Sequence, residues 1–248
     1  TVFPVADQPI LALGAELPDS DVVIISRGDG DSEVEVASHD TGIASFDVVG
    51  NHDHPEGKIL SISNCAKTAI FHSFPTRRSS DLVVFSGNTE TPGNCTEIIR
   101  FPNVCSNAVI PGNPAYDFDS AGEAKLMAAM ISAYYIRTSD SGLPVLFKQT
   151  LDDSAALEEK QMAQGIENIQ IRYGEDVNGD DVVDRYVSAD QVTDWGEIHV
   201  VKLYLLMRSL TEVTAEAQNF RFAGSDYTST DKYFRQEFMS TTTIRNRG

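Results

Sequence analysis

Short apolar runs alternate with turn residues along most of the chain. Residues 21–26 (DVVIIS) form a compact apolar run that ends at the Gly/Asp turn RGDGD, and residues 57–63 (GKILSIS) alternate apolar with polar side chains. Runs of this length, bounded by Gly, Asp and Asn, are typical of β-strands, and strict alternation is typical of a half-buried strand. The pattern therefore predicts a chain rich in strands.

The strongest hairpin pattern lies between residues 165 and 208. Three isoleucines, Ile166, Ile169 and Ile171, mark a short strand-prone run, and Val and Tyr mark a second run over residues 182–187. Between them stands Asn178-Gly179, and Asn-Gly is the strongest short-range hairpin signal because both central residues of a type I′ turn need positive φ. We therefore predict a β-hairpin here.

Two further strand patterns extend this picture. Residues 198–205 are rich in β-branched and large apolar side chains and end at polar Arg208, which predicts one long central strand. Earlier in the chain, residues 131–137 and 145–149 flank the turn Asp140-Ser141-Gly142. Asp, Ser and Gly favour turns, so these two runs are predicted to pair as a second hairpin.

Two segments have a composition that favours helix. Residues 121–136 begin with Ala, Met, Glu and Lys, which favour helix, and close with ISAYYI, which favours strand, so we expect the segment to divide. Residues 157–164 (LEEKQMAQ) predict a short helix that ends with Gly165 at its C′ position. The expected fold class is therefore α+β and β-rich, with antiparallel sheets and short helices.

Length and charge limit the range of functions. The chain has 248 residues, of which 41% are apolar, enough for one domain spanning residues 1–248 with a real core. Its 37 acidic and 19 basic residues give a net charge of -18. Such a charge repels phosphate backbones and anionic lipid headgroups, so nucleic acid is not expected as a partner.

The acidic loop of the predicted hairpin is also a candidate cation site. Four of its residues fall at positions 1, 3, 5 and 9 of an EF-hand-type calcium loop: Asp176, Asn178, Asp180 and Asp184. Two positions depart from that pattern, because Asp181 stands where Gly is expected and Val187 where a bidentate Glu closes the loop. The alternative interpretation is a solvated acidic hairpin tip, and any Ca²⁺ bound here would bind more weakly or borrow oxygens from elsewhere.

Three cysteines, Cys65, Cys95 and Cys105, lie in the first half of the chain without the CxxC spacing of a zinc site. For an exported protein we expect one disulfide and a third thiol that is either free or paired with a Cys in the missing N-terminus. Cys65 with Cys95 is the preferred pairing, because both cysteines follow turn-like residues beside apolar runs. The alternative is three buried, unpaired thiols in a cytosolic protein.

The segment from Ser73 to Leu82, SFPTRRSSDL, differs from its surroundings. It interrupts a strand-like run and places two arginines in an otherwise acidic protein. Back-translated, it matches a common short-read sequencing adapter. We interpret it as an insertion that arose during sequence assembly, and the alternative is a polar surface loop.

No catalytic motif occurs in the chain, which lacks a G-x-S-x-G elbow, H-E-x-x-H, a P-loop and G-x-G-x-x-G. We therefore do not expect an enzyme. His52 and His54 flank Asp53 and form a candidate metal cluster, although an exposed turn explains the same residues. Trp195, the one tryptophan, is expected to cap the core ahead of the last long apolar strand.

Several segments together resemble the PilW family of type IV pilus minor pilins. In chain order they are DVVIISRGDGD, GKILSISNCAKTAIF, PGNCT, ISAYYIRTSDSGLPVLFKQTL, the block from Gly165 to Arg208, and STTTIRNR from Ser240 to Arg247. The block from Gly165 to Arg208 is the most specific match. The resemblance implies a pilin-like head domain whose long apolar N-terminal helix would precede Thr1.

The resemblance also implies a structural role. Such a protein would co-assemble with other minor pilins and the major pilin, prime type IV pilus assembly with the assembly machinery, and so support twitching motility and cell adhesion. Its head would be periplasmic and held at the inner membrane of a Gram-negative bacterium by the missing helix, then extracellular in the pilus. The alternatives are a minor pseudopilin of a type II secretion system, or a secreted calcium-binding β-domain that acts as an adhesin.

Overall fold

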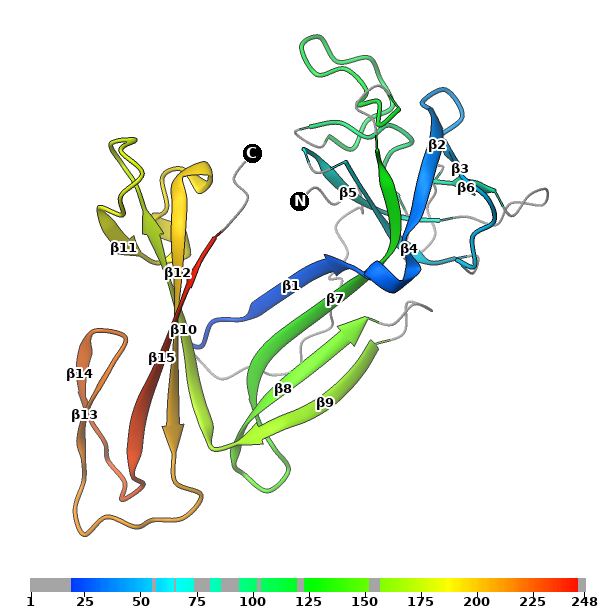
Figure 1. Cartoon of the computed structure of the whole chain (residues 1–248). Helices are drawn as coiled ribbons and strands as arrows, with labels where there is room; N and C mark the ends of the chain where they lie inside the picture. Colours follow the sequence, from blue (N-terminus) through cyan, green and yellow to red (C-terminus); the bar gives the residue numbers. More distant parts are fainter. Residues whose placement is uncertain are drawn as a thin grey trace. The chain divides into compact units, whose positions relative to one another are not determined.

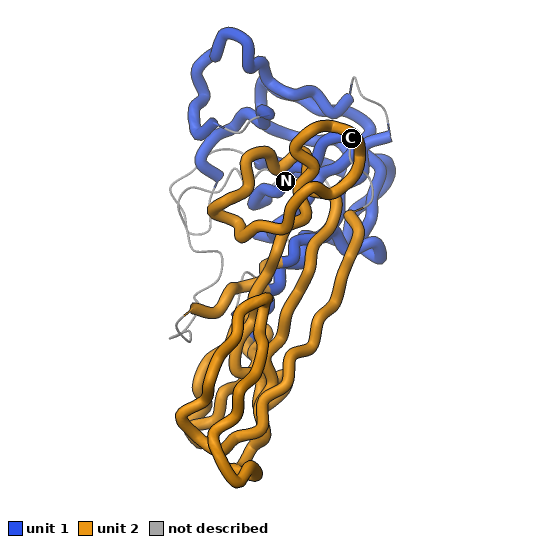
Figure 2. Tube along the Cα trace, turned by 90° about the vertical axis from the view of Figure 1, so that its left-hand side faces the viewer, with its two compact units in different colours: residues 1–12, 25–132, 150–158 blue, residues 13–24, 133–149, 159–248 orange. Residues whose placement is uncertain are grey.

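The computed structural model describes residues 19–54, 57–64, 66–73, 81–85, 94–101, 104–119, 123–151 and 157–244. The chain divides into two compact units, which are described separately (Figure 2). Described residues of unit 1 lie within 25–132 and 150–158, and those of unit 2 lie within 19–24, 133–149 and 159–244. The single domain expected over residues 1–248 stays a prediction.

Strands account for nearly all regular structure in the described residues (Figure 1). The strands of unit 1 are β2 (Val34–Asp40), β3 (Ser45–Val48), β4 (Ile59–Ser63), β5 (Thr68–His72) and β6 (Leu82–Val84). Those that pass from one unit to the other are β1 (Val23–Gly28), β7 (Lys125–Thr138), β8 (Pro144–Leu151) and β9 (Leu157–Gln164). Unit 2 adds β10 (Ile166–Glu175), β11 (Arg185–Val187), β12 (Ile198–Arg208), β13 (Asn219–Phe222), β14 (Ser225–Thr228) and β15 (Arg235–Thr243).

The β-rich, antiparallel part of the predicted fold class is confirmed. Helical structure in the described ranges is limited to three 3₁₀ turns, at Gly30–Ser32, Ala189–Gln191 and Trp195–Glu197. The short α-helices expected from composition are not found in those ranges.

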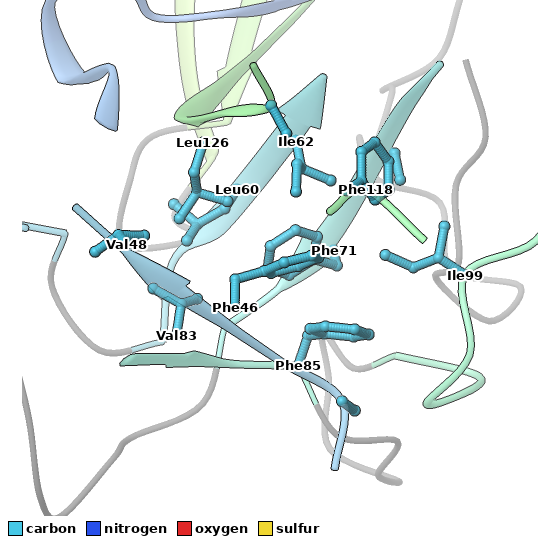
Figure 3. Close-up of a cluster of buried hydrophobic side chains, with 13 residues drawn as sticks. Phe46, Val48, Leu60, Ile62, Phe71, Val83, Phe85, Ile99, Phe118 and Leu126 are labelled. Atoms are coloured by element: carbon cyan, nitrogen blue, oxygen red, sulfur yellow. The ribbon is translucent and has the colours of Figure 1, made fainter. Parts of the chain in front are cut away.

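Unit 1 is built on strands in the order β5-β4-β7-β2-β3-β6. Aromatic and aliphatic side chains from these strands and from nearby loops form its core (Figure 3). The Phe46 ring stacks against Phe85 within this core and against His39 beside it, with ring centroids 4.8 and 4.4 Å apart. The strand predicted near residues 57–63 is β4. Both of its faces are covered, because Ser61 and Leu60, on opposite faces, are both buried, so β4 is not the half-buried strand that the alternation predicted.

Unit 2 contains a four-stranded antiparallel sheet in the order β11-β10-β12-β15, and a separate two-stranded hairpin of β13 and β14. The predicted central strand over residues 198–205 is confirmed as β12, which lies between β10 and β15 (Figure 1). Its register places Leu205 opposite Ile169 on β10 and opposite Phe238 on β15. The isoleucines of β10 and alternate apolar residues of β12 belong to one core cluster.

The predicted hairpin between residues 131–137 and 145–149 is confirmed as β7 and β8, closed by a hydrogen bond from Ser139 N to Leu143 O of 2.8 Å. The helix expected in the first part of residues 121–136 is wrong, because β7 is extended from Lys125 onward. Its buried residues alternate from Ala129 to Tyr135. That period of two is hard to read in the sequence, since Ala and Met stand on both faces.

The predicted helix over residues 157–164 is also wrong, because this segment is β9, which pairs with β8. The Leu, Glu, Lys, Met and Gln residues of this segment favour a helix, and most of their side chains are exposed. The strand is instead stabilised by pairing with β8 and by contacts of Glu159. The Glu159 carboxylate accepts hydrogen bonds from Tyr135 and Arg137 on β7. Gly165 has φ +82° and joins β9 directly to β10 instead of ending a helix.

The disulfide in the structure joins Cys95 to Cys105, with Cα atoms 5.1 Å apart, and so differs from the predicted pairing of Cys65 with Cys95. Cys65 lies outside the described residues. The intervening loop folds back on itself, because the buried Arg100 guanidinium donates to the carbonyls of Ser106 and Ala108 at 2.6 Å each. The turn-like residues before the cysteines do not predict that Cys95 pairs with Cys105. Residues 74–80 of the suspected insertion also lie outside the described residues.

Candidate functional site

The hairpin between β10 and β11 carries the predicted acidic loop at its tip. Pairs such as Tyr173 with Val187 and Glu175 with Arg185 confirm the hairpin. The prediction of a type I′ turn at Asn178-Gly179 is wrong, because only Gly179 of that pair has positive φ, at +79°. The strands are joined by the nine residues from Asp176 to Asp184, and β11 begins only at Arg185.

Asp176 organises this loop from its first position. Its Oδ1 accepts hydrogen bonds from the amides of Asn178 (3.0 Å) and Gly179 (2.7 Å), and its Oδ2 accepts one from the amide of Asp181 (2.7 Å). Asp181 has φ +65°, a left-handed conformation at the position where the EF-hand-type pattern has Gly. The departure from Gly at residue 181 therefore does not prevent the turn.

The other candidate calcium ligands lie in the same loop and accept hydrogen bonds from it. Asn178 Oδ1 accepts from Asp180 N, and Asp180 Oδ1 accepts from Val182 N, each at 3.0 Å. Asp184 Oδ2 accepts from the amide of Val177 at 2.8 Å, and its Oδ1 accepts from Asn178 Nδ2 at 3.2 Å. The hydrogen bonds explain the loop without an ion, so calcium at Asp176, Asn178, Asp180 and Asp184 stays a prediction.

The Asp176 carboxyl is buried, and burial raises its pKa. The backbone amides of Gly179, Asp181 and Asn178 lower it by a larger amount, and the net result is a lowered pKa. The group is therefore an anion at neutral pH, held in place by the loop that it organises.

Glu175, the residue before Asp176, is fully buried and holds a second segment. Its Oε1 accepts hydrogen bonds from the amides of Thr193 and Asp194, both at 2.8 Å, and from the Thr193 hydroxyl. Its Oε2 accepts from Arg185 Nε at 3.0 Å and from an Arg185 terminal nitrogen at 2.8 Å. The hydroxyl of Thr193, the amide of Asp194 and the guanidinium of Arg185 together lower the pKa of Glu175 to about 2, although burial opposes them.

Glu175 was missed by the sequence reasoning. Its partners Thr193 and Asp194 follow it by 18 and 19 residues, and no motif links them. The bonds attach the segment between β11 and β12 to the end of β10. That segment also carries Trp195, whose ring packs edge-on against Tyr173 at 4.9 Å but is more than half exposed, so it covers only the rim of the expected core.

A third group of side chains gathers where β10 ends and β12 begins. His199 Nε2 lies 3.7 Å from Asp176 Oδ2 and 3.9 Å from Glu197 Oε2. The backbone fixes this arrangement, because the Asp176 amide donates to the Glu197 carbonyl at 3.0 Å. Among the described residues this is the one group of three or more acidic, His or Cys side chains with metal-ligand spacing. Sequence reasoning missed Glu197 and His199, because only the strand register brings them to Asp176.

The other candidate metal cluster is less complete. The rings of His52 and His54 stack with centroids 5.6 Å apart. No third metal-ligating side chain joins them within the described ranges of the chain. The structure therefore gives this histidine pair no closed set of ligands.

The low pKa of Glu175 predicts a loss of stability in acid. A carboxyl whose pKa falls on folding stabilises the native state above its unfolded pKa, and this contribution is lost as the pH falls toward the folded value. For Glu175 the window runs from 4.5 to about 2, and for Asp231, paired with Arg235, from 3.8 to about 2. We expect the free energy of unfolding from urea titrations to fall across this range. Glu175→Gln should lower stability at pH 7 and flatten the profile, and an unchanged slope in the variant would contradict this assignment.

Comparison with known proteins bears on the same part of the chain. Residues 133–246 match the model of the family described as Type IV Pilus-assembly protein W. No curated protein and no solved structure matches the chain significantly. The described residues include no helix with the length and apolar character needed to cross a membrane. The resemblance to PilW, a family of type IV pilus-assembly proteins, is thus confirmed over residues 133–246, from the second half of β7 to β15.

Proposed function

We propose that the protein is a minor pilin, a pilin-like head that co-assembles with other minor pilins and with the major pilin to prime type IV pilus assembly. Its role is structural rather than catalytic. The head is periplasmic while an N-terminal helix holds it at the inner membrane, and extracellular once it is in the pilus. The family match over residues 133–246 supports this proposal, because it covers the whole four-stranded sheet of unit 2.

The observation that carries the proposal furthest is the edge of that sheet formed by β15. The strand pairs with β12 and forms one end of the sheet order. Phe238 and Met239 on β15 are 47% and 56% exposed. An edge strand presents unpaired N–H and C=O groups, and exposed apolar side chains beside such an edge mark a surface for another chain. The head of a neighbouring pilin is the occupant that we propose.

The charge of the chain favours a different protein over a second copy as that neighbour. A net charge of -18 on each subunit makes self-association unfavourable at moderate salt. A basic head would instead be attracted and a less acidic head would be repelled less, because complementary potentials steer association and disfavour wrong pairings. This reasoning fits a subunit that assembles with other pilins.

The proposal is tested by co-expressing the chain with the soluble heads of minor pilins and the major pilin from the same genome. We expect a stable complex on size-exclusion chromatography with light scattering. Phe238→Lys and Met239→Lys should each weaken it by about tenfold or more, as expected when a buried contact residue is replaced by a charge. Val109→Lys, at a side chain 91% exposed in unit 1, is the matched control and should leave the complex intact. Failure to bind any pilin head, or binding only to pseudopilin heads of a type II secretion system, would overturn the proposal.

A further inference from the structure

We propose that Asp176, Glu197 and His199 bind one divalent first-row transition ion, for which Zn²⁺ is the appropriate probe. The site shares Asp176 with the predicted calcium loop. Its remaining ligands come from the 3₁₀ turn and strand that follow that hairpin, not from Asn178, Asp180 or Asp184. An imidazole and two carboxylates form its ligand set.

The spacing of the three side chains fits a shared ion. The His199 imidazole nitrogen is 3.7 and 3.9 Å from the two carboxylate oxygens, and all three ligand atoms lie within 4.8 Å of one another. These distances exceed the ~2.7–2.9 Å of a direct charge-assisted hydrogen bond. Two ligand atoms that each lie ~2.1 Å from one tetrahedral ion are about 3.4 Å apart. The two nitrogen–oxygen separations exceed this value by a few tenths of an ångström, and the two carboxylate oxygens are at most 4.8 Å apart, so rotation of the side chains would close the site.

The backbone holds the ligands near these positions. Glu175 lies opposite Ile198 in the β10–β12 ladder, and the Asp176 amide donates to the Glu197 carbonyl at 3.0 Å. On the other side of β12, the His199 carbonyl accepts from the Ile244 amide at 2.9 Å. Asp176 and Glu197 flank the paired strands and His199 lies on one of them, and ligands held at the ends of paired strands need little rearrangement on binding, which favours affinity.

The donor chemistry selects the class of ion. Asp176 is buried and anionic, and its Oδ2 accepts one amide hydrogen bond while the same oxygen faces His199. A carboxylate oxygen has more than one acceptor direction, so a metal bond is compatible with that hydrogen bond. Imidazole nitrogen favours Zn²⁺ and its neighbours over Ca²⁺ and Mg²⁺, which prefer oxygen. Glu197, whose side chain is 46% exposed, lies at the mouth of the site and gives the ion access from solvent.

Calorimetric titration of Zn²⁺ into the full 248-residue chain, freed of metal by a chelator, tests the site at pH 7.5. His199→Gln is expected to weaken Zn²⁺ binding by about 100-fold and Glu197→Gln by at least about tenfold. Loss of a residue that only hydrogen-bonds to a metal ligand weakens metal binding by about 10- to 100-fold, and loss of a ligand itself should cost no less. Asp180→Asn is the matched control, because it removes one charge from the same loop while its amide oxygen still accepts from Val182. Calcium at about 1 mM should not displace the Zn²⁺, because imidazole is a poor calcium ligand.

Each other outcome would overturn the assignment. If the unaltered chain binds no Zn²⁺ at about 1 mM, its dissociation constant is above the millimolar range, which is too weak for a formed site. His199 would then only form ion pairs with the carboxylates. Equal binding by the unaltered chain and His199→Gln would place the ion elsewhere, for example at His52 and His54. An equal loss in Asp180→Asn would assign the ion to the acidic loop. If His199→Gln fails to fold by circular dichroism, the exposed variant Glu197→Gln decides, and unchanged affinity in it would refute the proposal.

Discussion

Replacing Gly165 by alanine is expected to lower the free energy of unfolding of unit 2 by about 2–4 kcal/mol, from left-handed strain and a disturbed hydrogen bond. Gly165 has φ +82°, and a Cβ there would lie 2.7 Å from the carbonyl oxygen of Arg208. The clash is with backbone, so no side-chain rotation relieves it. The end of β12 would have to move away, which disturbs the 2.8 Å hydrogen bond from the Arg208 amide to the Gly165 carbonyl.

Urea unfolding followed by the fluorescence of Trp195, the one tryptophan, measures this effect within unit 2. Gly142→Ala is the matched control, because Gly142 has φ +76° in the β7–β8 turn but no atom within 4 Å of an added Cβ. It should cost only the left-handed strain of about 1–2 kcal/mol. Equal destabilisation by the two variants would show that the contact with Arg208 has no energetic consequence.

Replacing Phe46 by alanine is expected to cost unit 1 about 3–5 kcal/mol, the usual range for removing a fully buried aromatic ring. The Phe46 side chain has no exposed surface and packs against the rings of Phe71 and Phe85 (Figure 3). It also stacks against the His39 ring. The neighbouring rings come from three other segments, so they are not expected to collapse into the cavity without disturbing strand pairing.

Thermal and urea unfolding followed by circular dichroism measures the effect of Phe46→Ala. Ile43→Ala, at an exposed residue in the turn just before β3, is the control and should change the free energy of unfolding by less than about 0.5 kcal/mol. A loss of less than about 1 kcal/mol for Phe46→Ala would mean that the cluster repacks around the missing ring.

Sequence reasoning succeeded where one segment carried its own signal. The strand over residues 198–205 is rich in Val, Ile and Leu, the hairpin partner over residues 166–171 carries three isoleucines, and both strands are present in the structure. It failed for residues 157–164, where exposed Glu, Lys and Gln side chains favour helix but β8 supplies a pairing partner. Composition reports local preference, and a neighbouring strand can override it.

The candidate sites show the same division. The loop from Asp176 to Asp184 was visible as an acidic cluster, but the conformation that joins its residues was not, because it depends on left-handed φ at Asp181. Glu197 and His199 are separated from Asp176 by more than a hairpin and reach it only through the register of β10 with β12. The partner of Cys95 was likewise decided by closure of a loop whose hydrogen bonds have no sequence motif.

Glu175 and Asp176 are consecutive in the chain, yet their carboxylates accept hydrogen bonds from two different loops. Glu175 secures the segment that contains Thr193 and Asp194, while Asp176 secures residues 178–181. Glu175 also binds Arg185, which directly follows the loop that Asp176 holds. We therefore expect this corner of the sheet to accept new recognition loops, one at a time, as long as Glu175, Asp176 and Arg185 are kept.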